Sequence, residues 1–170
     1  MIWHVASAAF VFRWVFRDPK VDYRFLIAGA LAPDVVDLLT GTVLVPRLAT
    51  GELMAHSLLL PSLVAVVVLL ATRRGRRRRA WMAFVVGWLI HLLVDGMWAT
   101  AEVFFWPLFG WDFSPGEAPF WPLAWRRALA DPVRWLLDAI GLAYLAVLWR
   151  RHGLSDPQAR SRLLATGRLD

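Results

Sequence analysis

The chain of 170 residues contains no cysteine. This absence excludes disulfide bonds and thiolate metal sites, and it leaves imidazole and carboxylate side chains as the candidate metal ligands. The first residues, 1–14, also lack the basic start and the small-residue cleavage site of a secretory signal peptide, so we expect a retained helix there. No internal repeat is evident, and the length suits one domain.

Hydrophobic residues make up 59% of the chain, and the mean hydropathy is +0.52. Soluble domains contain about 45–50% apolar residues. Here the apolar residues lie in long blocks, several of which approach the roughly 17–25 residues needed to cross a bilayer. The sequence therefore predicts an all-α fold, a polytopic transmembrane helical bundle with membrane segments at about 2–16, 25–45, 53–72, 80–99 and 133–149.

The net charge of +6 is concentrated in arginine clusters. The run RRGRRRR, residues 73–79, lies between two membrane-length segments, and further basic residues lie at 13–24 and after 149. Basic loops favour the cytoplasm, so five crossings place the N-terminus outside and the C-terminus inside. Residues 1–152 would form the membrane domain and residues 153–170 a polar cytoplasmic tail. Anionic lipid explains the 73–79 run, and no nucleic-acid partner is expected.

The predicted outer loop, residues 100–132, is rich in tryptophan, phenylalanine and proline. Its central part, 104–125, cannot form one regular helix, because proline breaks helices. Aromatic side chains favour the headgroup level of a bilayer. The loop is therefore interpreted either as an aromatic anchoring belt or as a lid and lipid-contacting rim over a site.

Six ionisable residues lie inside the predicted membrane segments, where such residues are rare and indicate a functional site. The orientation set by the arginines places all six within roughly the outer 5–15 Å of the membrane, at about 1.5 Å per helical residue. Gly87, one turn before the fifth of them, permits close approach of a neighbouring helix. The six residues are His4, Asp34, Asp37, His56, His91 and Asp95.

Imidazole and carboxylate groups bind Zn²⁺, Mn²⁺ or Fe²⁺, and a divalent cation compensates carboxylate charge that hydrocarbon cannot. We therefore predict a divalent metal site, with zinc as the first choice and manganese or iron as alternatives. All six residues are candidate ligands. Asp34 and Asp37 are also candidate general bases for a metal-bound water. The depth of the site suggests a lipid-like or phosphoester substrate, with membrane lipids as neighbours.

Short motifs around these residues resemble those of predicted membrane-bound metal-dependent hydrolases, which include LexA-binding, inner-membrane-associated hydrolases of bacteria. The resemblance covers about residues 1–112 and implies a multi-pass protein of the bacterial inner membrane. The motifs occur in the family's order and are His4, GALAPDVVD (Gly29–Asp37), AHSLLLP (Ala55–Pro61), HLLVD (His91–Asp95) and WPLFG (Trp106–Gly110).

The chain departs from the family pattern at two places. The family's His-Arg-Gly-x-Thr-His-Ser segment is GELMAHS here, so its first histidine has no counterpart and Glu52 is the nearest candidate replacement. The second acid follows Asp34 by three residues, where many members have two. His91 and Asp95 also resemble a helix motif of zinc-dependent phospholipase C and the S1/P1 nucleases, whose second such motif is missing here.

Two other functions remain open. The six residues would suit a divalent-metal-binding or transport protein without hydrolase activity, because transporters hold ions between polar residues on facing helices. They would also suit a structural or regulatory protein in which a polar cluster fixes helix packing. A transport pathway needs polar groups through the full membrane, and segment 133–149 offers only Asp138, expected toward the cytoplasmic side.

Overall fold

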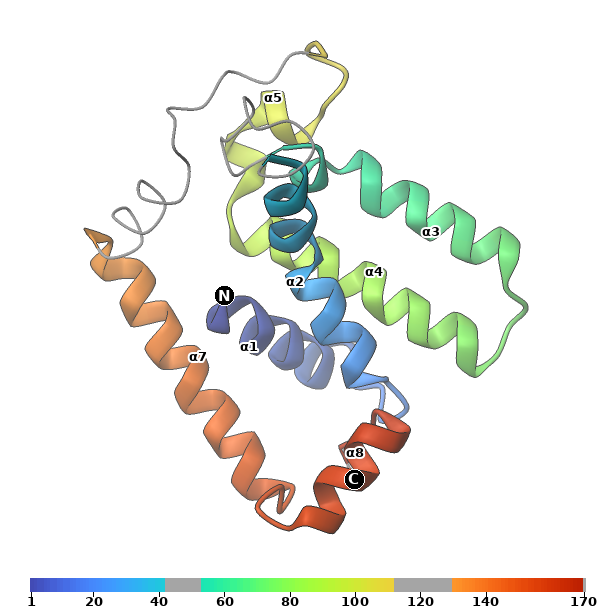
Figure 1. Cartoon of the computed structure of the whole chain (residues 1–170), viewed down its shortest axis with the longest axis vertical. Helices are drawn as coiled ribbons and strands as arrows, with labels where there is room; N and C mark the ends of the chain where they lie inside the picture. The colour runs from blue at the N-terminus through green and yellow to red at the C-terminus, as the bar shows by residue number, and fades with distance from the viewer. Residues whose placement is uncertain (42–52, 112–129, 170) are drawn as a thin grey trace.

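A computed structural model describes residues 1–41, 53–111 and 130–169 of the chain (Figure 1). Within these residues all regular structure is helical, which confirms the predicted all-α class. Part of the predicted segment 25–45, Glu52 and most of the aromatic loop lie outside the described residues. The helices are α1 (Ile2–Val11), α2 (Tyr23–Leu39), α3 (Leu59–Ala71), α4 (Arg76–Val94), α5 (Ala101–Phe104), α7 (Pro132–Arg151) and α8 (Pro157–Thr166).

The longer helices α1, α2, α3, α4 and α7 overlap the five predicted segments, and two of the boundary differences bear on the predicted site. Segment three begins with a 3₁₀ turn, Met54–His56, and its α-helix starts only at Leu59. Segment four ends as an α-helix at Val94, because Gly96 adopts a left-handed conformation at φ 69°. As a result, His56 lies in the 3₁₀ turn before α3 and Asp95 at the C-cap of α4, and neither is inside a regular α-helix.

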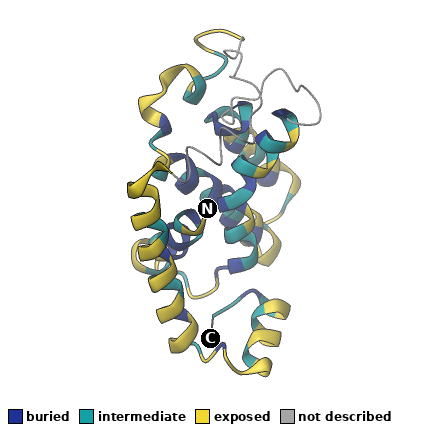
Figure 2. Cartoon of the chain, turned by 60° about the vertical axis from the view of Figure 1, so that its left-hand side comes forward, coloured by how far each residue is buried: buried dark blue, intermediate teal, exposed yellow. Residues whose placement is uncertain are grey.

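One described helix, α7, is long and apolar enough to cross a membrane by itself. The helical stretch Ile2–Phe16 and α3 are apolar but shorter. Figure 2 shows that α7 is largely exposed, and large apolar patches of this kind mark contact with protein or membrane. The exposed apolar side chains on α3 and α7 include Leu63, Val66, Val67, Leu70, Trp135, Leu136, Ile140, Leu142 and Val147.

The centre of the fold is the packing of α2 against α4, with α1 and α3 against the flanks of this pair and α7 against α1 (Figure 1). Two glycines permit the central contact. A Cβ at Gly29 would overlap the Phe84 carbonyl oxygen, and a Cβ at Gly87 would overlap the Leu26 carbonyl oxygen. The backbones of α2 and α4 therefore touch at both points, which confirms the close approach predicted at Gly87.

Substituting Gly87 by alanine should lower the melting temperature of the detergent-solubilised protein, because a backbone atom cannot move aside as a side chain can. Overpacking of this kind typically destabilises a protein by about 1–3 kcal/mol. Gly141→Ala is the control and should destabilise less, because its methyl group would lie 3.1 Å from the Ala6 Cβ and the Trp3 Cα, whereas a Cβ at Gly87 would overlap the Leu26 carbonyl oxygen. A Gly87→Ala protein as stable as the wild type would contradict this packing.

The beginning of α2 meets the end of α8. Asp22 caps α2 by accepting the Arg24 backbone N–H, and its carboxylate pairs with the Arg24 guanidinium at 2.7 Å. Arg24 also donates to the carbonyl oxygens of Leu164 and Ala165, the last turn of α8. The C-terminal residues predicted as a polar tail thus form a helix docked on the start of α2.

The Arg24 guanidinium, hydrogen-bonded to the Asp22 carboxylate, holds the pKa of Asp22 below its ordinary value of 3.8. A lowered native pKa stabilises the fold above the ordinary value, and the contribution is lost as the pH falls through the native pKa. Asp22→Asn keeps the helix cap but removes the charge. We expect the wild type to have a higher melting temperature than this variant at pH 6. The difference should become smaller as the pH falls below about 4. A difference in melting temperature that does not change with pH would show that the Asp22–Arg24 ion pair does not stabilise the fold.

Candidate metal centre

The six predicted site residues lie together where four parts of the fold meet. His4 is in the first turn of α1, Asp34 and Asp37 are on α2, and His56 is in the turn before α3. His91 is in the last turn of α4, and Asp95 is at its C-cap. Segments separated by up to about ninety residues in sequence are thus brought to one place, where His4 and Asp95 are in contact.

Four of the six residues place a ligand atom toward a common centre. Asp34, His56, His91 and Asp95 each offer one such atom, and these atoms all lie within 4.8 Å of one another. The Nε2 atoms of His56 and His91 are 3.4 Å apart. The Asp34 Oδ1 atom lies 3.7–3.8 Å from both of them, and the Asp95 Oδ2 atom lies 2.9 Å from His91 and 3.7 Å from His56.

The hydrogen bonds behind the two histidines fix how each ring is protonated. His56 Nδ1 lies 2.7 Å from the Asp37 carboxylate, and His91 Nδ1 lies 2.7 Å from the Ala30 carbonyl oxygen. Both partners are acceptors, so each Nδ1 carries a hydrogen, and Nε2 is the nitrogen of each ring that can bind a metal or a second proton. A proton or a metal cation at these Nε2 atoms would offset the negative charge of the two neighbouring carboxylates.

The distances between the four ligand atoms suit a single metal ion. Zinc binds imidazole nitrogen and carboxylate oxygen at about 2.0–2.2 Å, and a tetrahedral arrangement then separates neighbouring ligands by about 3.3–3.5 Å. The separations that involve a histidine are 2.9–3.8 Å, and all four ligand atoms lie within 4.8 Å of one another. The His56 and His91 side chains are 2% and 0% exposed, whereas those of Asp34 and Asp95 are 25% and 30% exposed. The cluster is therefore closed on its imidazole side and open on its carboxylate side.

Asp37 lies behind the cluster. Its carboxylate accepts the backbone N–H groups of Leu53 and Ala55 at 2.6 and 2.9 Å, in addition to the hydrogen of His56 Nδ1. It is 1% exposed. These three donors hold the turn that carries His56 and orient the imidazole. Asp37 therefore contacts His56 from behind and does not face the other candidate ligands, so it would orient the imidazole of His56 if a metal is bound there.

His4 supports the cluster from α1. Its Nε2 lies 2.6 Å from Asp95 Oδ1, the carboxylate oxygen that points away from the other ligands. Its ring stacks on that of His91, with centroids 4.1 Å apart and an angle of 21° between the planes. His4 Nδ1 and Asp34 Oδ2 are buried without a hydrogen-bond partner among the described residues. Two polar atoms therefore remain available beside the centre.

Asp138 lies in the first half of α7, against the start of α1. It accepts the backbone N–H of Trp3 at 2.8 Å, next to His4. Gly141, one turn further along α7, packs on the same turn of α1. The helix α7 thereby fixes the start of α1 and the position of His4. In the sequence, Asp138 is recognisable as the one acidic residue of segment 133–149, but no rule of sequence spacing predicts its contact with α1.

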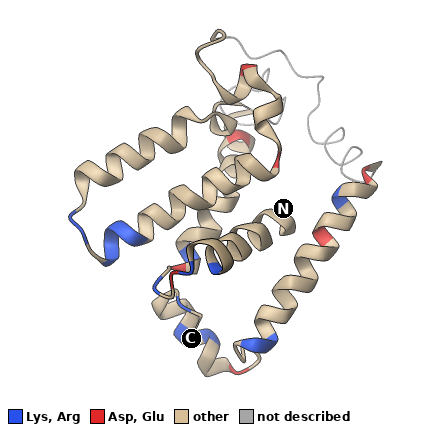
Figure 3. Ribbon diagram, turned by 180° about the vertical axis from the view of Figure 1, so that it is seen from behind, with Lys and Arg blue, Asp and Glu red and all other residues tan. Residues whose placement is uncertain are grey.

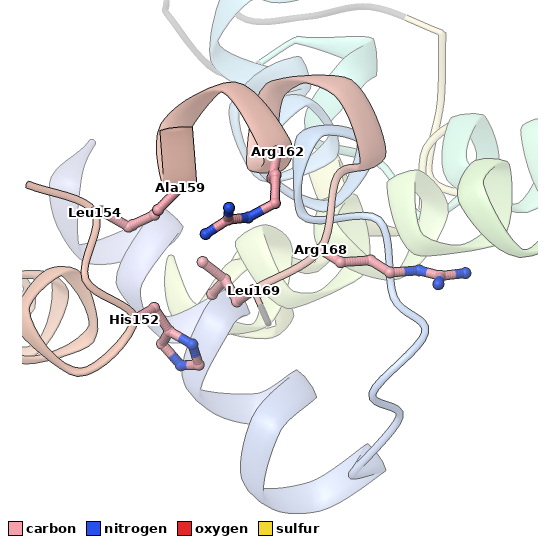
Figure 4. A pocket seen from close by; sticks show the side chains of 6 residues that line it. All are labelled: His152, Leu154, Ala159, Arg162, Arg168 and Leu169. Atoms are coloured by element: carbon pink, nitrogen blue, oxygen red, sulfur yellow. The ribbon is translucent and has the colours of Figure 1, made fainter. Parts of the chain in front are cut away.

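His152 lies apart from the cluster, at the far end of α7, where its Nε2 is 3.0 Å from an Arg13 guanidinium nitrogen. It lines a cavity of about 10 Å³ together with Leu154 and Arg162 (Figure 4). A cavity of that size holds no more than one water molecule. We therefore do not regard this region as a substrate site.

Comparison with known proteins places the chain among membrane proteins. The family model described as YdjM inner membrane protein matches residues 1–155. The chain belongs to this family. The predicted inner-membrane location is thereby confirmed. No curated protein and no solved structure matches the chain.

In this YdjM family member, Asp37→Asn should weaken zinc binding by about 10–100-fold, the usual effect of losing a partner that orients a metal-bound histidine. Zinc affinity is measured by competition with a chromophoric chelator. Asp131→Asn is the matched control, because Asp131 caps α7 away from the cluster and asparagine caps equally well. Equal zinc affinity in the Asp37→Asn protein and in the control would show that Asp37 does not orient a ligand.

Proposed function

We propose that this protein is a divalent-metal-dependent hydrolase embedded in the inner membrane, acting on a lipid-like or phosphoester substrate at the outer leaflet. One observation carries the proposal. The Nε2 atoms of His56 and His91 face each other at 3.4 Å, because the Nδ1 atom of each ring is held by an acceptor behind it. Two carboxylates complete a set of four side chains whose ligand atoms converge on one centre.

The ligand set favours zinc. Two imidazole nitrogens and two carboxylate oxygens match the nitrogen and oxygen ligands that zinc accepts, and manganese or iron are the alternatives for the same set. The open carboxylate side, formed by Asp34 and Asp95, leaves room for water or substrate. Because four protein ligands already complete a tetrahedral zinc shell, a water or substrate would enter from this side as a fifth ligand.

A bound divalent ion would lower the pKa of a coordinated water and polarise a phosphoryl or acyl oxygen. The protein's residues have separate tasks around it. Asp34 Oδ2, which has no hydrogen-bond partner in the described structure, is placed to accept a proton from that water. His4 holds Asp95 through its Oδ1 atom, and Asp37 holds His56. We assign the proton-accepting role to Asp34 and an orienting role to Asp37.

The five-crossing orientation belongs to this proposal. Figure 3 shows Lys and Arg gathered at the α3–α4 turn, at the α1–α2 connection and at the α7–α8 end. The metal cluster lies at the opposite ends of α2 and α4, because Arg77 and His91 are separated by about 21 Å along α4 at 1.5 Å per residue. With basic loops in the cytoplasm, the cluster faces the outer leaflet. A site at headgroup depth suits an amphipathic ester.

The direct test measures metal content and turnover in His91→Ala and Asp95→Asn proteins, with His152→Ala as the control for loss of a histidine outside the cluster. We expect stoichiometric zinc in the wild type and the control, and loss of both zinc and activity in the two site variants. Removing a metal-bound water should reduce turnover of a phosphoester or phospholipid panel by at least about 100-fold.

Two results would contradict the proposal. Unchanged metal content in the His91→Ala and Asp95→Asn proteins would show that the cluster is not a metal site. Metal flux into proteoliposomes, without hydrolysis of any lipid or phosphoester in the panel, would favour the transport alternative.

A further inference from the structure

A cavity of about 400 Å³ lies between the first turns of α2 and α4. It is separated from the metal cluster by most of the length of both helices, and the residues discussed above for hydrolysis do not line it. Arginine and aromatic side chains share its wall, among them Arg24, Arg76, Arg77, Phe25 and Trp81.

The polar side of the cavity is electropositive. Arg24, Arg76 and Arg77 line it, and Asp22 is the one acidic side chain among the lining residues. Asp22 pairs with Arg24. Arg76 donates to the Thr166 carbonyl oxygen, which satisfies a hydrogen bond but leaves the positive charge uncompensated. Arg77 is exposed. This side therefore favours an anion with several acceptor oxygens.

The other side of the cavity is aromatic. The rings of Phe25 and Trp81 pack edge to face, with centroids 5.1 Å apart, and Trp81 is 38% exposed. Tryptophan favours the level of lipid headgroups, where one edge of the ring meets hydrocarbon and the other meets water. A small inorganic anion would use only the arginines. A ligand that uses both sides carries a phosphate and an apolar part.

We propose that this cavity binds the headgroup of an anionic phospholipid of the cytoplasmic leaflet. Arg76 and Arg77 contact the phosphate, and the glycerol and first acyl carbons lie against Phe25 and Trp81. The chain belongs to an inner-membrane family, and the cavity adjoins the arginine run at 73–79, so an anionic lipid is the ligand that its surroundings supply. This site is independent of the hydrolase chemistry, but its assignment to the cytoplasmic leaflet rests on the orientation proposed above.

The test compares single arginine substitutions in the full chain, solubilised in detergent and titrated with dioleoylphosphatidylglycerol under native mass spectrometry. Arg77→Gln should weaken lipid binding by about tenfold, the effect of losing one hydrogen bond to a charged phosphate. Arg74→Gln is the matched control, because it removes the same charge from the same loop but does not line the cavity. We expect less than about a twofold change for it, because the charge of an exposed residue that does not contact the lipid is screened by solvent and salt.

Dioleoylphosphatidylcholine and inorganic phosphate are the two further probes. Weak binding of both, together with strong binding of the phosphatidylglycerol, supports the proposal. Equal losses in the Arg77→Gln and Arg74→Gln proteins would overturn it, because the loop charge alone would then bind lipid. Phosphatidylcholine bound as tightly as phosphatidylglycerol would exclude headgroup recognition, and inorganic phosphate bound as tightly would assign the cavity to a free anion.

Discussion

The direct contact between the backbones of α2 and α4 determines where the metal-site residues lie. Gly29 and Gly87 allow each helix to touch a carbonyl oxygen of the other, and no side chain fits between them. Ala30 follows Gly29, and His91 lies one turn after Gly87, so the same contact brings His91 Nδ1 to the Ala30 carbonyl. A wider separation of the two helices would break this hydrogen bond and turn the imidazole away from Asp34.

The charge arrangement at the cluster follows from that geometry. Two imidazoles and two carboxylates place their ligand atoms within 4.8 Å of one another. Because the imidazoles are buried, a cation at the centre would compensate the carboxylate charge that the surrounding protein cannot. The residues behind it, His4 and Asp37, are also polar and buried, and each has a partner that fixes a ligand. The hydrogen bonds that order this part of the fold are therefore the same ones that would position the ligands of a cation.

Much of the site was predictable from the sequence, because ionisable residues in apolar segments are few and the arginines set their depth. That reasoning brought His4 and Asp95 together although ninety-one positions separate them. The separate role of Asp37 was not predictable, since it depends on where the N–H groups of Leu53 and Ala55 lie. The docking of α8 was not predictable either, because it rests on single hydrogen bonds from Arg24 to backbone carbonyls.

The central claim is that His56, His91, Asp34 and Asp95 surround one divalent metal ion. An anomalous-scattering map from crystals of the protein, collected above and below the zinc absorption edge, tests it most directly. One peak is expected at about 2.0–2.2 Å from both histidine Nε2 atoms and from one oxygen of each carboxylate. A map with no anomalous peak between the two histidines, from protein purified without chelator and supplied with zinc, would contradict it.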